Sequence, residues 1–273
     1  MTTPFDAAHF LRAAAALRAF ADPDAAMIAS LRSRSRDMGK LLGEIAACRT
    51  RLDELEKLLD EVVMPPFVFD LSNPEMVGEV IAAKLEQQPK TRLGDLPRFY
   101  GSGVYILYYS GPSPVYAAIS GTEVPIYVGS KAPKSKGAAS PREQGVALFD
   151  RITEHRARSI EKAASTLDAQ DFHVRYLVVH SGNEKAAEDH LIRRYSPVWN
   201  DEAKVCSGLG KHGDVARGEK SQWDVLHPGR PWAARQASRS GATPDTVRAA
   251  IQGHFLTLLR QDRPRWSKAF APA

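Results

Sequence analysis

The sequence contains very little cysteine. Cys48 and Cys206 are the only two in 273 residues. This count argues against a disulfide framework and against a zinc site built from cysteines. Two free thiols are typical of a protein from a reducing compartment.

Long hydrophobic runs are also missing. The apolar stretches have the length of β-strands and fall well short of the ~20 residues that a membrane helix needs. The first residues show no basic segment followed by an apolar core, which is the pattern of a secretory signal. We therefore expect a soluble, cytoplasmic protein without membrane contact. A hydrophobic content of 43% in 273 residues is enough for one good core and a second, smaller unit.

Positive charge is concentrated in the second half of the chain. Residues 217–273 carry ten Lys and Arg against four Asp and Glu, whereas residues 1–130 carry thirteen against sixteen. A basic surface attracts polyanions, although scattered surface lysines would produce the same count. Charge alone therefore favours nucleic acid as the partner.

The first 63 residues are predicted to be helical. An alanine-rich helix over residues 6–20 is followed, after a proline, by a long helix over residues 24–63. The apolar residues of the long helix recur at alternating spacings of three and four, and they are Met38, Leu41, Ile45, Cys48, Leu52, Leu55, Leu59 and Val62. Such a heptad seam predicts pairing with another helix. The short preceding helix and a second copy of the chain are both possible partners.

Met64-Pro65-Pro66 predicts a domain boundary near residue 65, because proline ends a helix. The rest of the chain is predicted to be α+β, a small antiparallel sheet flanked by helices, with the first 63 residues as a helical hairpin or coiled-coil extension. Helices are expected at 74–88, 144–164 and 183–195 and from Thr243 onward, and strands at 104–109, 115–119, 124–128 and 172–179. The first three strands would form a meander.

Two polar residues lie on an apolar face of the helix predicted over residues 144–164. Arg151 and His155 are four residues apart and share that face with Leu148 and Ile152. A half-buried arginine needs an anion and a buried histidine needs a hydrogen-bond partner. A structural ion pair with a core histidine would satisfy both, and so would a functional site.

Glu188 repeats this pattern on the next helix. It lies on the apolar stripe with Leu191 and Tyr195, whereas we expect Glu184 and Asp189 in solvent. A lone inward carboxylate suits Mg²⁺, which often takes only one or two protein carboxylates. The alternative is an ion pair with Arg151.

Two tyrosines lie in short glycine-containing runs that are typical of strands. Tyr105 ends Gly103-Val104-Tyr105 and Tyr127 begins Tyr127-Val128-Gly129, with Lys131 shortly after. Glycine lets a backbone approach a ligand closely. Taken singly, tyrosines in a small sheet are usually packing residues.

In this order, the motifs resemble those of the GIY-YIG nuclease superfamily. The matching positions are Gly103-Val104-Tyr105, Tyr127-Val128-Gly129, Arg151, His155, Glu188 and Pro197-Val198-Trp199-Asn200. Longer stretches such as NPEMVGEVIAAKLEQQP, PIYVGSKAP and WDVLHPGRPWA are similar to the branch of type II restriction endonucleases that cut CCGCGG. The resemblance divides the chain into a helical extension (1–63), a nuclease core with DNA-recognition segments (66–235) and a C-terminal helical extension (236–273). Ser130 separates Gly129 from Lys131, where many relatives have lysine directly after the glycine.

The resemblance implies single-metal hydrolysis without a covalent intermediate. Glu188 would anchor Mg²⁺ and Arg151 would offset charge on the phosphorus. Tyr105 would take the proton of the attacking water, and a hydrogen bond to neutral His155, together with the metal and the arginine, would lower its pKa from about 10 toward 7.

The resemblance also assigns three supporting residues. Tyr127 and Asn200 would hold the phosphate in line, and Lys131 would add a cation.

The resemblance further implies double-stranded DNA as the substrate and a homodimer on a palindrome. A companion DNA methyltransferase is expected in the bacterial cell, although not as a bound subunit. Arginine and lysine can donate to guanine O6 and N7, which suits a GC-rich site. The DNA-binding candidates are Lys211, His212, Arg217, Lys220, Arg230 and Arg235. Contact with phosphates alone is the alternative role for these residues.

Two other functions compete with restriction. A repair or mobile-element nuclease shares the same core but usually carries separate binding modules. A DNA-binding or scaffold protein would have a vestigial site and would use the heptad helix as its working part.

Overall fold

The computed structural model describes residues 11–12, 15, 35–59, 62, 70, 72–135, 137–179, 182–200, 203, 205–210, 219–238 and 241–260. The chain divides into two compact units, Met1–Val68 and Phe69–Ala273. No helix in the described ranges is long and apolar enough to cross a membrane.

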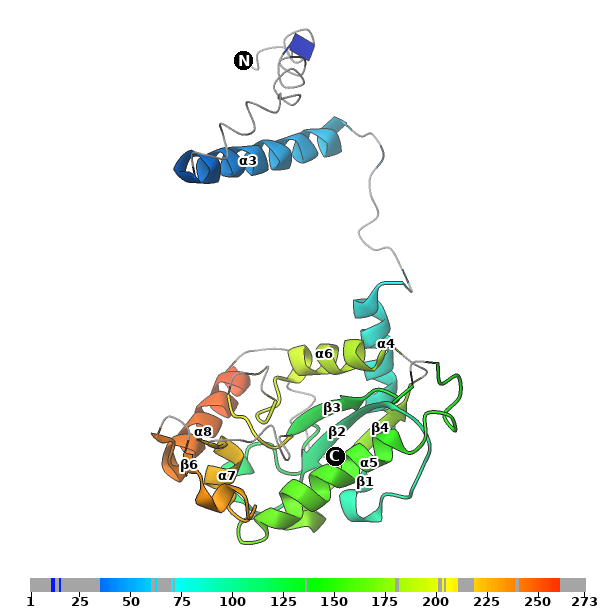
Figure 1. The fold of residues 1–273 in the computed structure, drawn as a ribbon, viewed down its shortest axis with the longest axis vertical. Helices are drawn as coiled ribbons and strands as arrows, with labels where there is room; N and C mark the ends of the chain where they lie inside the picture. Colours follow the sequence, from blue (N-terminus) through cyan, green and yellow to red (C-terminus); the bar gives the residue numbers. More distant parts are fainter. Residues whose placement is uncertain are drawn as a thin grey trace. The chain divides into compact units, whose positions relative to one another are not determined.

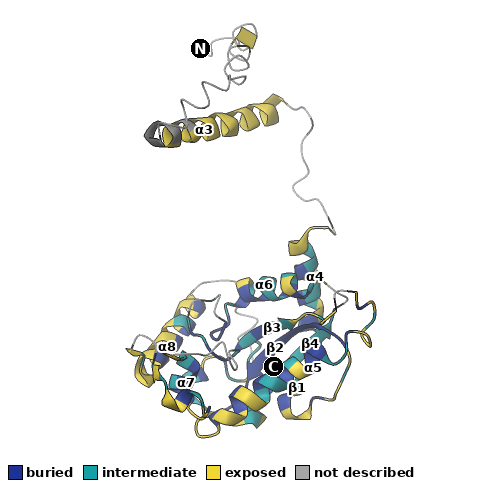
Figure 2. Ribbon diagram, in the orientation of Figure 1, coloured by how far each residue is buried: buried dark blue, intermediate teal, exposed yellow. Residues whose placement is uncertain are grey.

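The first unit contains α3, which spans Ser35–Leu59. Its described side chains are exposed along the whole helix, as Figure 2 shows. The exposed seam includes Ile45, Leu52, Leu55 and Leu59. The side chains of Met38 and Leu41 and most of the predicted helix over residues 6–20 lie outside the described residues, so pairing of the seam stays a prediction.

The second unit is built on a four-stranded antiparallel sheet in the order β1-β4-β2-β3 (Figure 1). Its strands are β1 (Thr91–Arg92), β2 (Gly103–Tyr109), β3 (Tyr127–Lys131) and β4 (Phe172–Val178). The central strand β2 is buried along its whole length because it has a neighbour on both edges and helices over its faces. The α+β architecture predicted from the sequence is confirmed.

Two predicted strands differ from the structure. Residues 115–119 do not form a strand: Pro114–Tyr116 is a 3-10 turn, and the following residues continue as turns. Tyr116 and Ile119 both point into the core, and this spacing of three residues belongs to a helical turn rather than a strand. The strand predicted over 124–128 begins only at Tyr127, so β2 and β3 pair directly across a long connection.

Helices cover both faces of the sheet. α5 (Ala147–His155) and α6 (Glu184–Tyr195) both contact β2 and β3, and Figure 1 shows them on opposite sides of the sheet. α4 (Pro74–Glu86) packs against α6 so closely that a Cβ at Gly78 would lie 2.6 Å from the carbonyl oxygen of Ala186. α5 continues into a π-helical turn, Arg156–Ile160.

The remaining elements form a smaller layer beside the sheet. They are the parallel pair β5 (Glu219–Lys220) and β6 (Ala237–Ser238), the short α7 (Gln222–Leu226) and α8 (Pro244–Arg260). α8 packs on α7, and the buried residues of α8 are Val247, Ile251, Phe255 and Leu258.

Candidate active site

The centre of the site is a buried tyrosine–histidine pair. Tyr105 lies on β2 and His155 is the last residue of α5, and both side chains are inaccessible to solvent. The Tyr105 Oη lies 2.5 Å from His155 Nε2. The predicted hydrogen bond between these two residues is confirmed.

The surroundings of Tyr105 favour the protonated form of its phenol. Burial, and then the neighbouring Tyr127, raise the pKa of Tyr105 well above its ordinary value, and Arg151 only partly opposes them. The expected lowering of this pKa by its surroundings is therefore not found in the chain alone. A protonated Oη can donate to His155 Nε2 when that ring nitrogen carries no hydrogen.

Both motif glycines allow backbone to pass where a side chain would clash. The register pairs Gly129 with Tyr105, and a Cβ at residue 129 would lie within 3.0 Å of the Tyr105 ring and hydroxyl. A Cβ at Gly103 would collide with the carbonyl oxygen of Leu177 on β4. The glycines are therefore required by close packing inside the sheet.

Tyr127 and Arg151 complete the wall around the pair. The Tyr127 ring centroid lies 5.0 Å from that of His155 and 6.3 Å from that of Tyr105. Arg151 Nη1 donates to Glu154 at 3.0 Å, and Nη2 donates to the carbonyl oxygen of Gly210 at 3.5 Å. Glu154 also pairs with Arg158, so one carboxylate binds the guanidinium groups of both arginines.

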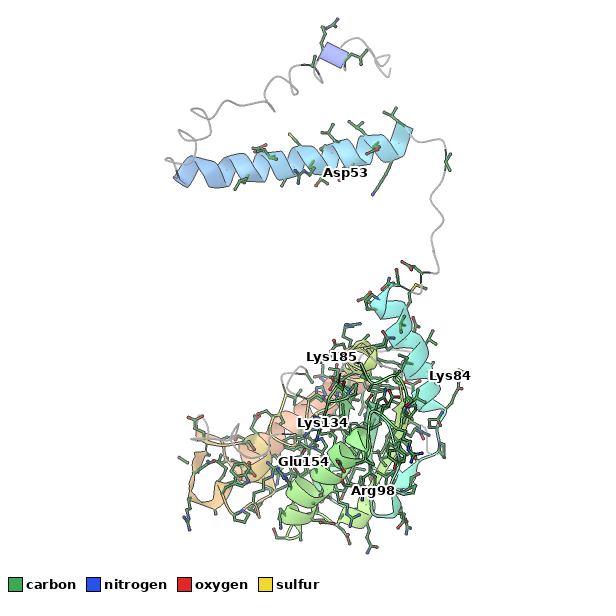
Figure 3. All side chains as sticks on the ribbon, turned by 45° about the vertical axis from the view of Figure 1, so that its right-hand side comes forward. Asp53, Lys84, Arg98, Lys134, Glu154 and Lys185 are labelled. Atoms are coloured by element: carbon green, nitrogen blue, oxygen red, sulfur yellow. The ribbon has the colours of Figure 1, made fainter. Side chains whose placement is uncertain are left out.

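Glu188 lies on α6 with its side chain 15% exposed. Its Oε2 accepts hydrogen bonds from Ser130 Oγ at 2.9 Å and Lys185 Nζ at 3.2 Å. Figure 3 labels Lys185 on α6 and Glu154 on α5. Within the part of the chain that the structure describes, Glu188 pairs with Lys185 and not with Arg151, which pairs with Glu154.

The expectation for Glu184 was wrong. Its side chain is buried rather than in solvent, because it accepts from Ser102 Oγ at 3.3 Å and from the backbone N–H of Gly182 at 2.9 Å. Asp189 is partly exposed and pairs with Lys185 at 2.7 Å.

The donor set at Glu188 fits a hard cation better than zinc. The described residues contain no group of three or more His, Cys, Asp or Glu that could hold a metal. Mg²⁺ keeps most of its waters and often takes only one or two protein carboxylates, so a single carboxylate such as Glu188 is compatible with this ion.

Asn200 binds the protein backbone instead of facing an open site. Its Oδ1 accepts from Val128 N at 2.9 Å and its Nδ2 donates to Val128 O at 2.8 Å, and the residue is 3% exposed. The amide thus occupies the free edge of β3 between Tyr127 and Gly129. Lys131, the last residue of β3, is exposed.

The DNA-binding candidates separate into three groups. Lys211, His212 and Arg217 lie outside the described residues. Lys220 on β5 is half-buried and Arg235 is exposed, so both are accessible. Arg230 is a wrong prediction: the residue is only 2% exposed and its guanidinium is bound to protein groups.

Sequence reasoning missed three residues of the site. Ser130 was seen only as an interruption before Lys131, yet it donates to Glu188. Glu154 stands three residues after Arg151, a spacing that marks possible ion pairs on a helix. Gly210 carries no sequence signal of this kind, because its position against the site depends on the folding of a distant loop.

Comparison with known families agrees with this geometry. No curated protein matches the chain. A family model described as the Eco29kI GIY-YIG domain matches residues 97–255, more than half of the 273 residues. The match includes β2, β3, α5, α6 and each of the residues assembled above. The chain therefore belongs to the Eco29kI GIY-YIG family, a family of type II restriction endonucleases.

Proposed function

We propose that this protein is a type II restriction endonuclease that hydrolyses both strands of DNA at a short GC-rich palindrome. The observation that carries the proposal is the buried contact of 2.5 Å between Tyr105 Oη and His155 Nε2. A relay that connects a phenol to a neutral imidazole can accept a proton from water. Arg151 lies in the same cluster with a permanent positive charge.

In the proposed mechanism Tyr105 relays a proton instead of acting as a preformed phenolate. The attacking water transfers its proton to Oη while the phenol proton passes to His155 Nε2, which leaves an imidazolium and a neutral tyrosine. This order avoids ionising a phenol in a site that raises its pKa. It replaces the simpler expectation that the surroundings bring the phenol pKa near 7.

The phosphate would lie between Tyr127 and Arg151. The hydrogen bond to Glu154 already fixes the Arg151 side chain. Its remaining donors could therefore bind an anion without a further loss of side-chain entropy. Glu188 and Ser130 would hold Mg²⁺, which supplies Lewis-acid stabilisation of the leaving oxygen. Asn200 would act through Val128, by holding the strand that carries Tyr127.

DNA recognition would come from the region after the catalytic core. Lys220 and Arg235 are accessible there, and Lys211, His212 and Arg217 remain candidates for contact with guanine bases or phosphates. Cutting both strands of a palindrome requires two active sites, so we propose a homodimer. Lys131 would add a cation near the phosphate backbone. The host's DNA would be protected by a separate methyltransferase.

The test is incubation of the purified protein with supercoiled plasmid and Mg²⁺. Discrete linear fragments with a constant end sequence support the proposal. Nicks that follow DNA structure rather than sequence would indicate a repair nuclease. Binding without cleavage in Mg²⁺ or Mn²⁺ would indicate a DNA-binding protein with an inactive site.

A further inference from the structure

The segment Gly208-Leu209-Gly210 forms part of the wall of the active site. A Cβ at Gly210 would lie 2.8 Å from the Tyr127 hydroxyl and 3.5 Å from both Arg151 Nη2 and His155 Cε1. The carbonyl oxygen of Gly210 also accepts from Arg151. Gly210 therefore lies beside three of the residues assigned to the reaction, with no room for a side chain between them, and its carbonyl oxygen is bound to Arg151.

One buried side chain holds that segment. Arg230 Nη1 donates to the carbonyl oxygen of Gly208 at 3.0 Å, and Arg230 Nη2 donates to that of Leu209 at 3.0 Å. Two consecutive carbonyls are thus bound by the two arms of a single guanidinium. This geometry is available to arginine and not to lysine, whose donors all sit on one nitrogen.

The same guanidinium also binds the turn that follows α5. Arg230 Nε donates to the carbonyl oxygen of Arg158 at 3.0 Å, and Nη2 contacts Ser159 Oγ. Ser159 Oγ in turn donates to the carbonyl oxygen of Leu209 at 2.9 Å. Arg230 thereby joins the wall segment to the π-helical turn that begins directly after His155.

The fifth donor and the charge are satisfied by Asp224. Arg230 Nη1 lies 3.4 Å from an Asp224 carboxylate oxygen, and both side chains are 1% exposed. All five N–H groups of Arg230 therefore have a protein acceptor. A buried arginine is costly unless it is fully paired, and this pairing leaves no donor for DNA.

We propose that Arg230 is a positioning residue of the nuclease: it fixes Gly208–Gly210 against Tyr127, Arg151 and His155 so that these side chains keep their reactive arrangement. The inference rests on the proposed nuclease function. This role is more specific than a general contribution to folding, because Arg230 binds two segments that adjoin the site. One is the wall segment 208–210, and the other is the turn that follows His155. The proposed role also differs from a role in DNA binding, because the side chain cannot reach solvent.

The experiment compares Arg230→Lys and Arg230→Met with Leu93→Ala in the full-length protein. Leu93 is fully buried in a turn that contacts β4 and the turn at residues 169–171, so its truncation loosens the core elsewhere. Three quantities are measured: kcat for plasmid cleavage, the Kd for DNA in Ca²⁺, and amide hydrogen exchange of residues 205–210. Melting temperatures establish that the variants are folded and comparably destabilised.

For both Arg230 variants we expect kcat to fall about a hundredfold, since a misplacement of about 1 Å has that effect, while Kd stays within about threefold. Exchange in residues 205–210 should rise for Arg230→Met, whereas Leu93→Ala should keep the wild-type kcat and exchange in this segment. Cleavage by Arg230→Lys within threefold of wild type would overturn the proposal. A parallel loss of DNA affinity would also overturn it and would assign Arg230 to the DNA interface.

Ser159→Ala keeps the test decisive if the Arg230 variants do not fold. It removes one bond to Leu209 and one acceptor of Arg230 with little change in volume. We expect faster exchange in residues 205–210 and a loss in kcat of about tenfold, and no change in either would refute the inference. Wild-type protein that cuts no DNA would refute the nuclease function itself, whereas unchanged exchange in an active enzyme would refute only the role of Arg230.

Discussion

Gly129 on β3 lies directly against the phenol of Tyr105 on β2, with no room for a Cβ between them. Tyr105 is buried and its hydroxyl is bound to His155. The phenol therefore cannot move away from residue 129 without breaking its contact with His155. Residue 129 must therefore be glycine for Tyr105 to keep its position.

Gly129→Ala is expected to displace the Tyr105 ring or to separate β2 from β3. We predict that cleavage falls about a hundredfold, because the phenol leaves its position beside His155. Gly94→Ala is the matched control, since a Cβ at residue 94 meets nothing within 4 Å. Rates measured on the same plasmid give the comparison, and equal rates for the two variants would mean that the sheet absorbs the extra carbon.

Glu188→Ala is predicted to abolish cleavage while leaving DNA affinity within about threefold, because it removes the proposed metal anchor and no DNA contact. Asp189→Ala is the control: it neighbours Glu188 and shares Lys185 with it, but its carboxylate is not assigned to the metal. Band shifts in Ca²⁺ and cleavage in Mg²⁺ check both variants. Full activity of Glu188→Ala would place the metal elsewhere.

His227 is predicted to make the protein acid-labile. Trp199 Nε1 donates to Tyr116 Oη, which donates to His227 Nε2 at 2.7 Å, and His227 Nδ1 reaches Thr166 at 2.8 Å. Burial, with a smaller effect of Arg248, lowers the pKa of His227 from 6.5 to about 3. Neutral His227 therefore contributes its full stability to the fold above pH 6.5. As the pH falls toward 3 the unfolded chain binds this proton more readily than the folded chain, so that stability is lost.

The size of this effect is on the order of 5 kcal/mol in the free energy of unfolding, from a pKa difference of about 3.5 units at 1.36 kcal/mol each. Urea unfolding of the wild type and His227→Gln at several pH values measures it. The variant should be less stable at pH 7.5 and should lose less stability between pH 6.5 and 4. Identical pH dependence in the two proteins would show that folding does not lower the pKa of His227.

Removal of residues 1–63 is predicted to leave the second unit folded, because its core is made within Phe69–Ala273. If the heptad seam pairs two chains, the shortened protein will dimerise more weakly and will accumulate nicked plasmid before linear plasmid. Sedimentation and a plasmid assay that resolves both products test this. Unchanged dimerisation would mean that the seam pairs within its own chain or that the nuclease unit forms the dimer.

Local patterns in the sequence were enough to predict most of the fold. The helices α4, α6 and α8 and the strands β2 and β4 lie where their periodicity and caps place them. The strand predicted over residues 115–119 was wrong: Pro112 and Pro114 precede the β-prone residues there, and the local turn buries Tyr116 instead. Propensity is a weak guide where tertiary burial decides the conformation.

The site was only partly predictable for a related reason. Tyr105 and His155 could be paired from their motifs, and the structure brings them together. The partners of Arg230 could not be predicted, because a basic residue in a basic segment has the same sequence signature whether it faces DNA or a buried carbonyl. Only the folding of residues 208–210 against α5 distinguishes the two roles.

The proton relay between Tyr105 and His155 is the central claim, and a double-mutant cycle tests it most directly. Single-turnover cleavage rates would be measured for the wild type, Tyr105→Phe, His155→Ala and the double variant under identical Mg²⁺ and DNA concentrations. Each single change should lower the rate by at least about a hundredfold. The rate of the double variant should lie within about threefold of the slower single variant. Losses that multiply in the double variant would contradict a shared relay.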